Sequence, residues 1–245
     1  MANKHGAMAR AVPEDVAGRL IVALDLPSIA AAEGMVALLD GVVSFFKLGL
    51  GLLFAPGVDQ LITRLTSGGR RLFLDAKLFD IPETVARAVA RVAERGASFL
   101  TVHGDPRILE AAVAARGDAP LRIFAVTVLT SLDDAALAEM GYALTARALV
   151  RQRARQAVVA GCDGVIASAA DDPDALRRFA GSPNLLIATP GIRPAGSAAD
   201  DQRRIATPGA AIAAGADHLV VGRPIIAAAD PRASALAIMA EMAAA

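Results

Sequence analysis

"RLFLDAKLFDIPETV", residues 71–85, joins the two kinds of element from which the whole chain is built. Its first residues are typical of a buried strand, and the proline at position 82 suits the first turn of a helix. Three charged residues, Asp75, Lys77 and Asp80, stand between these two elements. A strand that ends in alternating charges just before a helix indicates a functional site at the end of the strand.

The same order of an apolar run followed by a helical segment recurs along the chain. We expect eight strands, at residues 19–25, 43–49, 70–77, 98–103, 122–129, 163–168, 184–190 and 217–222. Continuous apolar strands that alternate with helices indicate a parallel sheet covered by helices. Eight such units in 245 residues favour a single-domain α/β fold, the closed (β/α)8 TIM barrel, over an open doubly wound sheet. Residues 1–18 are predicted to be an N-terminal extension, and residues 19–245 the barrel domain.

Composition narrows the classes of partner and compartment. The 25 basic and 25 acidic residues cancel, and no basic patch with interleaved aromatic residues indicates nucleic-acid binding. The chain contains no run of about 18 uncharged apolar residues, so no membrane span is predicted. The N-terminus lacks the continuous apolar stretch of a signal peptide, and the single cysteine, Cys162, suits a reducing compartment. We therefore expect a cytoplasmic protein.

Charged residues gather where the predicted strands end. Asp75 and Lys77 occupy alternate positions of one strand and should share a face, while Asp25 and Lys47 end the first two strands. Strand ends meet at one face of a barrel, and buried charges are tolerated there only when they are paired. A structural ion-pair cluster at the rim is one interpretation. Four charges at successive strand ends favour a catalytic array.

A second group of residues predicts an anion site. The segment "VVGRPI" (220–225) ends the last strand with Gly222 and Arg223, just before a proline that suits a helix start. Backbone amides at such a start, next to an arginine, bind phosphate readily. The long loop after residues 184–190 supplies Arg193 and Gln202, although an arginine such as Arg193 or Arg204 is more often a solvated surface charge. Their combination with the last strand favours a phosphate site.

Several motifs together resemble a known family, the orotidine 5'-monophosphate decarboxylases, in its bacterial stand-alone form. The motifs are "LDAKLFDIPETV" (74–85), "ALD" (23–25), "FKLG" (46–49), "TVLTS" (127–131), "TPGIRP" (189–194), "DDQRRIATP" (200–208) and "VVGRPI". The resemblance extends from about residue 19 to residue 235. It implies decarboxylation of orotidine 5'-monophosphate to UMP, the last step of de novo pyrimidine biosynthesis, without a metal or any other cofactor.

The resemblance also implies roles for individual residues. Lys47, Asp75, Lys77 and Asp80 would form the catalytic array, with Lys77 donating a proton to C6 of the pyrimidine. The implied substrate-binding residues are Asp25 and Lys47 for the ribose, Thr130 for the pyrimidine edge, Pro190 for the ring, and Arg193, Gln202, Gly222 and Arg223 for the phosphate. Asp80 and Thr84 would reach into the active site of the neighbouring subunit, which makes the protein a homodimer with shared sites.

One departure and two alternatives accompany this prediction. The segment "TVHGDPRILEAA" (101–112) lacks the small residue and paired glycines of the family pattern, and His103 is interpreted as a structural or supporting residue. Related barrels, 3-keto-gulonate 6-phosphate decarboxylase and hexulose-phosphate synthase, share D-x-K-x-x-D but use Mg²⁺. They carry a glutamate ligand on the second strand, where this chain has Lys47, a cation that repels Mg²⁺. A non-catalytic phosphate-binding barrel would lack part of the array, and no part is missing.

Overall fold

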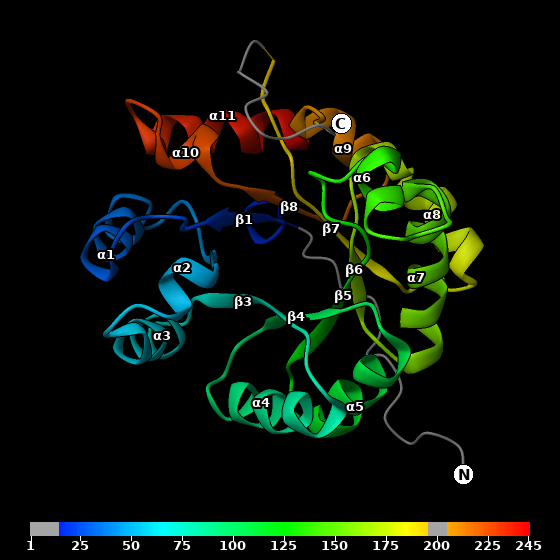
Figure 1. The fold of residues 1–245 in the computed structure, drawn as a ribbon. Helices are drawn as coiled ribbons and strands as arrows, with labels where there is room; N and C mark the ends of the chain where they lie inside the picture. The colour runs from blue at the N-terminus through cyan, green and yellow to red at the C-terminus, as the bar shows by residue number, and fades with distance from the viewer. Residues whose placement is uncertain (1–14, 196–204) are drawn as a thin grey trace.

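The computed structural model describes residues 15–195 and 205–245, and its centre is a closed barrel of eight parallel strands (Figure 1). Each strand pairs with the next one along the chain, and the last pairs with the first. The strands are β1 (Leu20–Ala23), β2 (Phe45–Leu48), β3 (Arg71–Leu78), β4 (Phe99–His103), β5 (Arg122–Val126), β6 (Gly164–Ile166), β7 (Leu186–Thr189) and β8 (His218–Val221). Every predicted strand overlaps an observed one, and β3 extends one residue past its predicted end, so the predicted (β/α)8 barrel is confirmed.

Helices surround the barrel and connect successive strands (Figure 1). They are α1 (Ile29–Leu38), α2 (Leu50–Leu53), α3 (Val58–Ser67), α4 (Pro82–Glu94), α5 (Pro106–Arg116), α6 (Asp134–Glu139), α7 (Ala146–Ala160), α8 (Pro173–Ala180), α9 (Pro208–Ala213), α10 (Arg223–Ile226) and α11 (Pro231–Ala243), with 3-10 turns η1 (Val16–Gly18) and η2 (Ala169–Asp171). Within the described ranges, no helix is long and apolar enough to cross a membrane.

The predicted N-terminal extension is only partly visible. Residues 1–14 lie outside the described residues, and η1 accounts for most of the remainder. In η1 the carbonyl of Gly18 accepts a hydrogen bond from the guanidinium of Arg71 at 3.1 Å. The boundary between an extension and a barrel domain at residue 18 stays a prediction.

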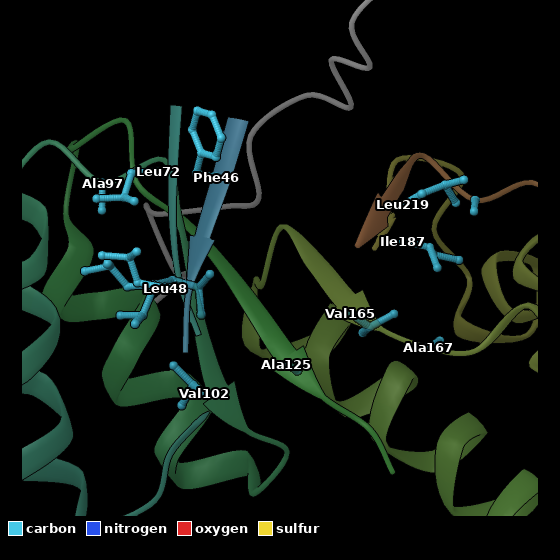
Figure 2. Packing of buried hydrophobic residues seen from close by; sticks show 14 of the residues in the cluster. Phe46, Leu48, Leu72, Ala97, Val102, Ala125, Val165, Ala167, Ile187 and Leu219 are labelled. Carbon is cyan, nitrogen blue, oxygen red and sulfur yellow. The ribbon is translucent and has the colours of Figure 1, made fainter. Parts of the chain in front are cut away.

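Strand residues alternate between two apolar layers. Side chains that point into the barrel form one buried cluster, which includes Phe45, Phe73, Phe99 and Phe124. Their neighbours in sequence point outward and pack beneath the helices. Figure 2 shows this outer layer, with Phe46, Leu48, Leu72, Ala97, Val102, Ala125, Val165, Ala167, Ile187 and Leu219 labelled. Because both faces of each strand are buried, the strands read as continuous apolar runs.

The inner layer depends on one glycine. A Cβ added at Gly164 in β6 would lie 2.4 Å from the ring of Phe124 and 2.7 Å from the carbonyl of Leu186. Phe124 also stacks on Phe99 at 4.4 Å between ring centroids. Large aromatic rings can therefore fill the interior of the barrel only because β6 has no side chain at this position.

Paired charges lie at the amino-terminal ends of two strands, opposite the strand ends that carry the predicted site. Asp163, just before β6, accepts hydrogen bonds from Arg116 and from the amide of Ile123. Asp217, just before β8, accepts the equivalent pair from Arg177 and the amide of Ile187. Both carboxylates are fully buried and fully partnered, so they hold the closed end of the barrel together.

Candidate active site

A cavity of about 620 Å³ opens where the strands end at their carboxyl termini. It is lined in part by residues that follow β1, β2, β5, β7 and β8 and by the end of β3. Nine of the twelve predicted site residues line it: Asp25, Lys47, Asp75, Lys77, Thr130, Pro190, Arg193, Gly222 and Arg223. Barrel enzymes carry their active sites at this face, so the cavity is the candidate active site.

Four charged side chains form a continuous chain of contacts across this cavity. Lys47 Nζ lies 3.0 Å from Asp25 Oδ1 and 3.4 Å from Asp75 Oδ2. Lys77 Nζ lies 2.8 Å from the same oxygen of Asp75. The side chain of Lys47 is 8% exposed and that of Asp75 is 14% exposed, whereas Lys77 is 37% exposed and open to the cavity. The predicted alternation of cations and anions is therefore present.

The two lysines decide the charge state of Asp75. Burial alone would raise the pKa of this carboxyl group. The positive charges of Lys47 and Lys77, with hydrogen bonds from Lys77 and Thr101, outweigh burial and lower the pKa of Asp75 below its ordinary value. Asp75 is therefore a carboxylate at neutral pH, and it faces the cavity beside an ammonium group.

Asp75 and Lys77 both line the cavity, but the backbone between them does not have the regular geometry of a strand. In the pairing of β3 with β4, Leu74 lies opposite Leu100, but Leu78 lies opposite Val102. Four steps along β3 therefore match two steps along β4, and the segment between them bulges. Lys77 has φ of +46°, a left-handed conformation that is unfavourable for a residue with a Cβ. The predicted shared placement is observed, but its cause is this bulge.

Gly49, immediately after β2, makes room for the first ion pair. A Cβ at this position would lie 2.8 Å from Asp25 Oδ1 and 3.1 Å from Lys47 Nζ. The sequence motif "FKLG" contains this glycine, but its role is visible only once Asp25 and Lys47 are seen in contact. A side chain at position 49 would push the carboxylate away from the ammonium group.

Two arginines, Arg193 and Arg223, line the cavity from the segments that follow β7 and β8. Arg193 is 7% exposed, and its backbone amide donates to the carbonyl of Ala206 at 2.9 Å. This bond and the bridge between Ile192 and Ala206 close the base of the loop that follows β7. Arg223 is the first residue of α10, directly after Gly222. Gln202, the remaining predicted phosphate ligand, lies outside the described residues.

The loop after β5 brings Thr130 to the cavity, where it is half-buried. This loop continues into the short helix α6 and then to Tyr142. The hydroxyl of Tyr142 accepts a hydrogen bond from Arg153 of α7 at 3.1 Å. The long connection is therefore tied to the helix that follows it.

Asp80 and Thr84 do not line the cavity of their own chain. Both are exposed, at the end of the β3 segment and in the first turn of α4. Asp80 Oδ1 accepts a hydrogen bond from the amide of Ile81 at 2.6 Å. Large apolar side chains flank it, since Phe79 is 68% exposed and Ile81 is 65% exposed.

His103, at the end of β4, contacts the segment that carries Asp80. Its ring lies 4.4 Å from that of Phe79, centroid to centroid, and is not part of the cavity lining. Burial and the charge of Arg153 lower the pKa of His103 despite the opposing charge of Asp105. A neutral ring packed beside the cavity agrees with the interpretation of His103 as a supporting residue.

Carboxylates at the cavity are separated by lysines rather than grouped. In residues 15–195 and 205–245, no three His, Cys, Asp or Glu side chains are arranged to hold a metal ion. Asp25 and Asp75 instead share Lys47 between them. The arrangement suits a substrate that carries its own negative charges.

Known proteins are similar to this chain over nearly its whole length. The family model described as orotidine 5'-phosphate decarboxylase / HUMPS family matches residues 18–238. An orotidine 5'-phosphate decarboxylase of Rhodopseudomonas palustris (strain BisB5) is 53% identical over 236 residues, which cover 96% of this chain and 99% of that protein. One of Caulobacter vibrioides (strain NA1000 / CB15N) is 52% identical over 227 residues, covering 92% and 97%.

A solved structure shows the same architecture. The crystal structure of orotidine 5'-phosphate decarboxylase from Lactobacillus acidophilus matches with a TM-score of 0.79 and 35% sequence identity, covering 91% of this chain and 98% of that one. The match to the family model extends over nearly the whole barrel, and the relatives are covered almost completely. The chain belongs to the orotidine 5'-phosphate decarboxylase / HUMPS family.

Proposed function

We propose that this protein decarboxylates orotidine 5'-monophosphate to UMP in the cavity at the carboxyl end of its barrel. The observation that carries the proposal is the contact of Lys77 Nζ with Asp75 Oδ2 at 2.8 Å, inside a cavity that two arginines also line. The curated relatives that are 52–53% identical over nearly the whole chain carry the name of this enzyme. Two arginines that can bind an anion, and the ammonium group of Lys77 in the same cavity, match a phosphorylated substrate that develops negative charge on carbon.

The reaction breaks the bond between C6 and the carboxylate carbon, and its electron pair stays on C6 as CO2 departs. No neighbouring group of the pyrimidine delocalises this pair well, so the barrier in water is high. The ammonium group of Lys77 stabilises the developing negative charge and then donates its proton to C6, which gives UMP. The neutral amine regains a proton from solvent before the next turnover.

Asp75 contributes through its charge. As a carboxylate next to the carboxylate of the substrate, it is unfavourable in the ground state, and this repulsion is relieved as CO2 leaves. Lys47 and Lys77 keep Asp75 ionised, so the repulsion is present at neutral pH. The same contact holds Lys77 at the position where charge develops.

The remaining residues bind parts of the substrate that do not react. We assign Asp25 and Lys47 to the ribose hydroxyls, Thr130 to the pyrimidine edge and Pro190 to the face of the ring. Arg193, Gln202, Arg223 and the backbone at Gly222 are assigned to the phosphate. Binding energy from this distant phosphate can be used to orient C6 against Lys77 and to exclude water.

The exposed segment after β3 supports a homodimer with shared active sites. Asp80 and Thr84 have no place in the cavity of their own chain, and Asp80 is flanked by the exposed apolar residues Phe79 and Ile81. Exposed large apolar side chains next to a charged residue are typical of an interface with another chain. We place Asp80 in the array of the partner subunit and Thr84 at the bound substrate there.

The proposed enzyme uses no metal or organic cofactor and works in the cytoplasm. A direct test follows the ultraviolet absorbance of orotidine 5'-monophosphate during incubation with the purified protein, with and without EDTA. Loss of the substrate and formation of UMP in both samples support the proposal. Turnover of orotidine 5'-monophosphate that EDTA abolishes would contradict a mechanism without a metal. A protein that leaves orotidine 5'-monophosphate unchanged would contradict the assignment.

A further inference from the structure

We propose that Thr101 is a positioning residue, which sets Asp75 and Lys77 in place for the decarboxylation proposed above, on which this inference rests. Thr101 lies in the middle of β4, and its side chain is completely buried. It does not line the cavity, so it is not a substrate ligand. Its hydroxyl group contacts both members of the central ion pair.

The two hydrogen bonds of this hydroxyl are compatible with each other. Thr101 Oγ1 donates its one proton to Asp75 Oδ1 at 2.8 Å. The same oxygen accepts a hydrogen bond from the backbone amide of Lys77 at 3.0 Å. A hydroxyl group offers one donor and two lone pairs, so it satisfies a carboxylate and an amide at the same time. The side chain of Thr101 thereby links the carboxylate of Asp75 to the backbone of Lys77.

The bond to the amide fixes an unfavourable backbone. Within the described ranges, Lys77 and Asp172 are the non-glycine residues with positive φ. Asp172 caps α8 with its own carboxylate, a local bond of the kind that favours this conformation in Asp and Asn. Lys77 has no such local bond to offer, and the hydrogen bond from its amide to Thr101 is what ties the bulge of β3 to β4.

The bond to the carboxylate fixes its orientation. Asp75 Oδ2 receives Lys77 Nζ at 2.8 Å and Lys47 Nζ at 3.4 Å, while Oδ1 receives Thr101. With both oxygens bonded from different strands, the plane of the carboxylate is determined. Without the hydroxyl group, Asp75 is free to rotate and the backbone of Lys77 loses its anchor.

Thr127 provides a matched control. It is also completely buried, and its hydroxyl donates a hydrogen bond to the carbonyl of Ile166 at 2.6 Å. No contact links the side chain of Thr127 to the charged array in the residues that the structure describes. Replacing either threonine by valine removes one buried hydroxyl at nearly constant volume, but only Thr101→Val reaches Asp75 and Lys77.

The experiment compares wild type, Thr101→Val, Thr101→Ser and Thr127→Val by steady-state kinetics with orotidine 5'-monophosphate, UMP affinity and thermal unfolding. We expect Thr101→Val to lower kcat on the order of tenfold to a hundredfold. KM and UMP affinity should change less than about threefold, because the phosphate and ribose contacts are intact. Thr101→Ser should recover most of kcat. Thr127→Val should keep the kcat of the wild type, although it should lose about as much thermal stability as Thr101→Val.

Three results would overturn the inference: wild-type kcat in Thr101→Val, equal losses of kcat in Thr101→Val and Thr127→Val, or no recovery in Thr101→Ser. If Thr101→Val does not fold, Thr101→Ala is measured in its place, because it removes the hydroxyl without steric demand. The wild type is assayed alongside every variant. An inactive wild type would contradict the proposed function itself, whereas an active wild type with an equally active Thr101→Val contradicts only the role of Thr101.

Discussion

Lys77 Nζ lies 2.8 Å from Asp75 Oδ2, and both side chains extend from a segment of β3 whose regular pairing with β4 is broken. The contact places a cation where the proposed reaction develops negative charge. It also holds an anion next to the position of the departing carboxylate. The proposed mechanism therefore depends on this ion pair.

The proposed sharing of active sites between two subunits predicts complementation between inactive variants. Lys77→Ala and Asp80→Ala are each expected to be inactive as pure dimers. When they are mixed and allowed to exchange, each mixed dimer has one site with an intact Lys77 and an intact Asp80 from the other subunit. Random exchange should restore about a quarter of the wild-type activity per subunit, since half of the dimers are mixed and one site in each is intact.

The control mixes two preparations of Lys77→Ala that carry different affinity tags. Dimers that carry both tags verify subunit exchange, but they contain no intact site. No recovery after verified exchange in the Lys77→Ala and Asp80→Ala mixture would argue against the placement of Asp80 in the neighbouring site.

Gly49→Ala should weaken substrate binding more than it slows the chemical step. The added Cβ lies 2.8 Å from Asp25 Oδ1, and this carboxylate is 57% exposed, so it can move away from Lys47. We expect KM to rise about tenfold, the effect of one lost hydrogen bond between charged groups, with a smaller fall in kcat. Gly51→Ala is the matched control, because a Cβ there meets nothing within 4 Å. Equal KM values in the two variants would contradict the role assigned to Asp25.

His218 should make the fold sensitive to acid. Its burial in the barrel, and the charges of Arg71 and Arg122, lower the pKa of His218 to about 3. In the unfolded chain the same group titrates near its ordinary pKa of about 6.5, so the unfolded state binds the proton first as pH falls. The stability that this neutral histidine preserves at pH 7 is therefore lost progressively from about pH 6.5 down to about pH 3.

Urea unfolding at fixed protein concentration measures this effect. Between pH 7 and pH 4, the free energy of unfolding of the wild type should fall by on the order of 3 kcal/mol more than that of His218→Gln, whose side chain does not titrate. The comparison is made within each protein, so a constant loss of stability in the variant does not affect it. Parallel declines in the two proteins would show that His218 is not held neutral.

Most of the fold could be predicted from the sequence, because each strand and each helix end leaves a pattern in its own short segment. Each strand is buried on both faces, so each is visible as an apolar run, and positive-φ glycines such as Gly161 and Gly215 mark where a helix ends before the next strand. Strand ends meet at one face of a barrel, so Asp25, Lys47, Asp75 and Lys77 could be placed together before any coordinates were known.

Other features of the site depend on contacts that no single-strand pattern contains. A threonine within an apolar strand is an ordinary strand former, so nothing in "SFLTVH" marks Thr101 as the partner of Asp75 and Lys77. Regular alternation also gives no sign of the bulge at Lys77, which is a property of the pairing between β3 and β4. The role proposed for Asp80 requires a second subunit, whereas a single chain shows only that Asp80 is exposed.

In the proposed mechanism the ammonium group of Lys77 performs the chemistry, and the Lys77→Ala variant shows whether turnover depends on it. Its kcat for orotidine 5'-monophosphate and its affinity for UMP are measured together, with Arg155→Ala, an exposed cation on α7, as the control. We expect a folded Lys77→Ala protein that binds UMP within about tenfold of wild type and loses at least on the order of 10⁴-fold in kcat. Near-normal turnover in Lys77→Ala would contradict this mechanism.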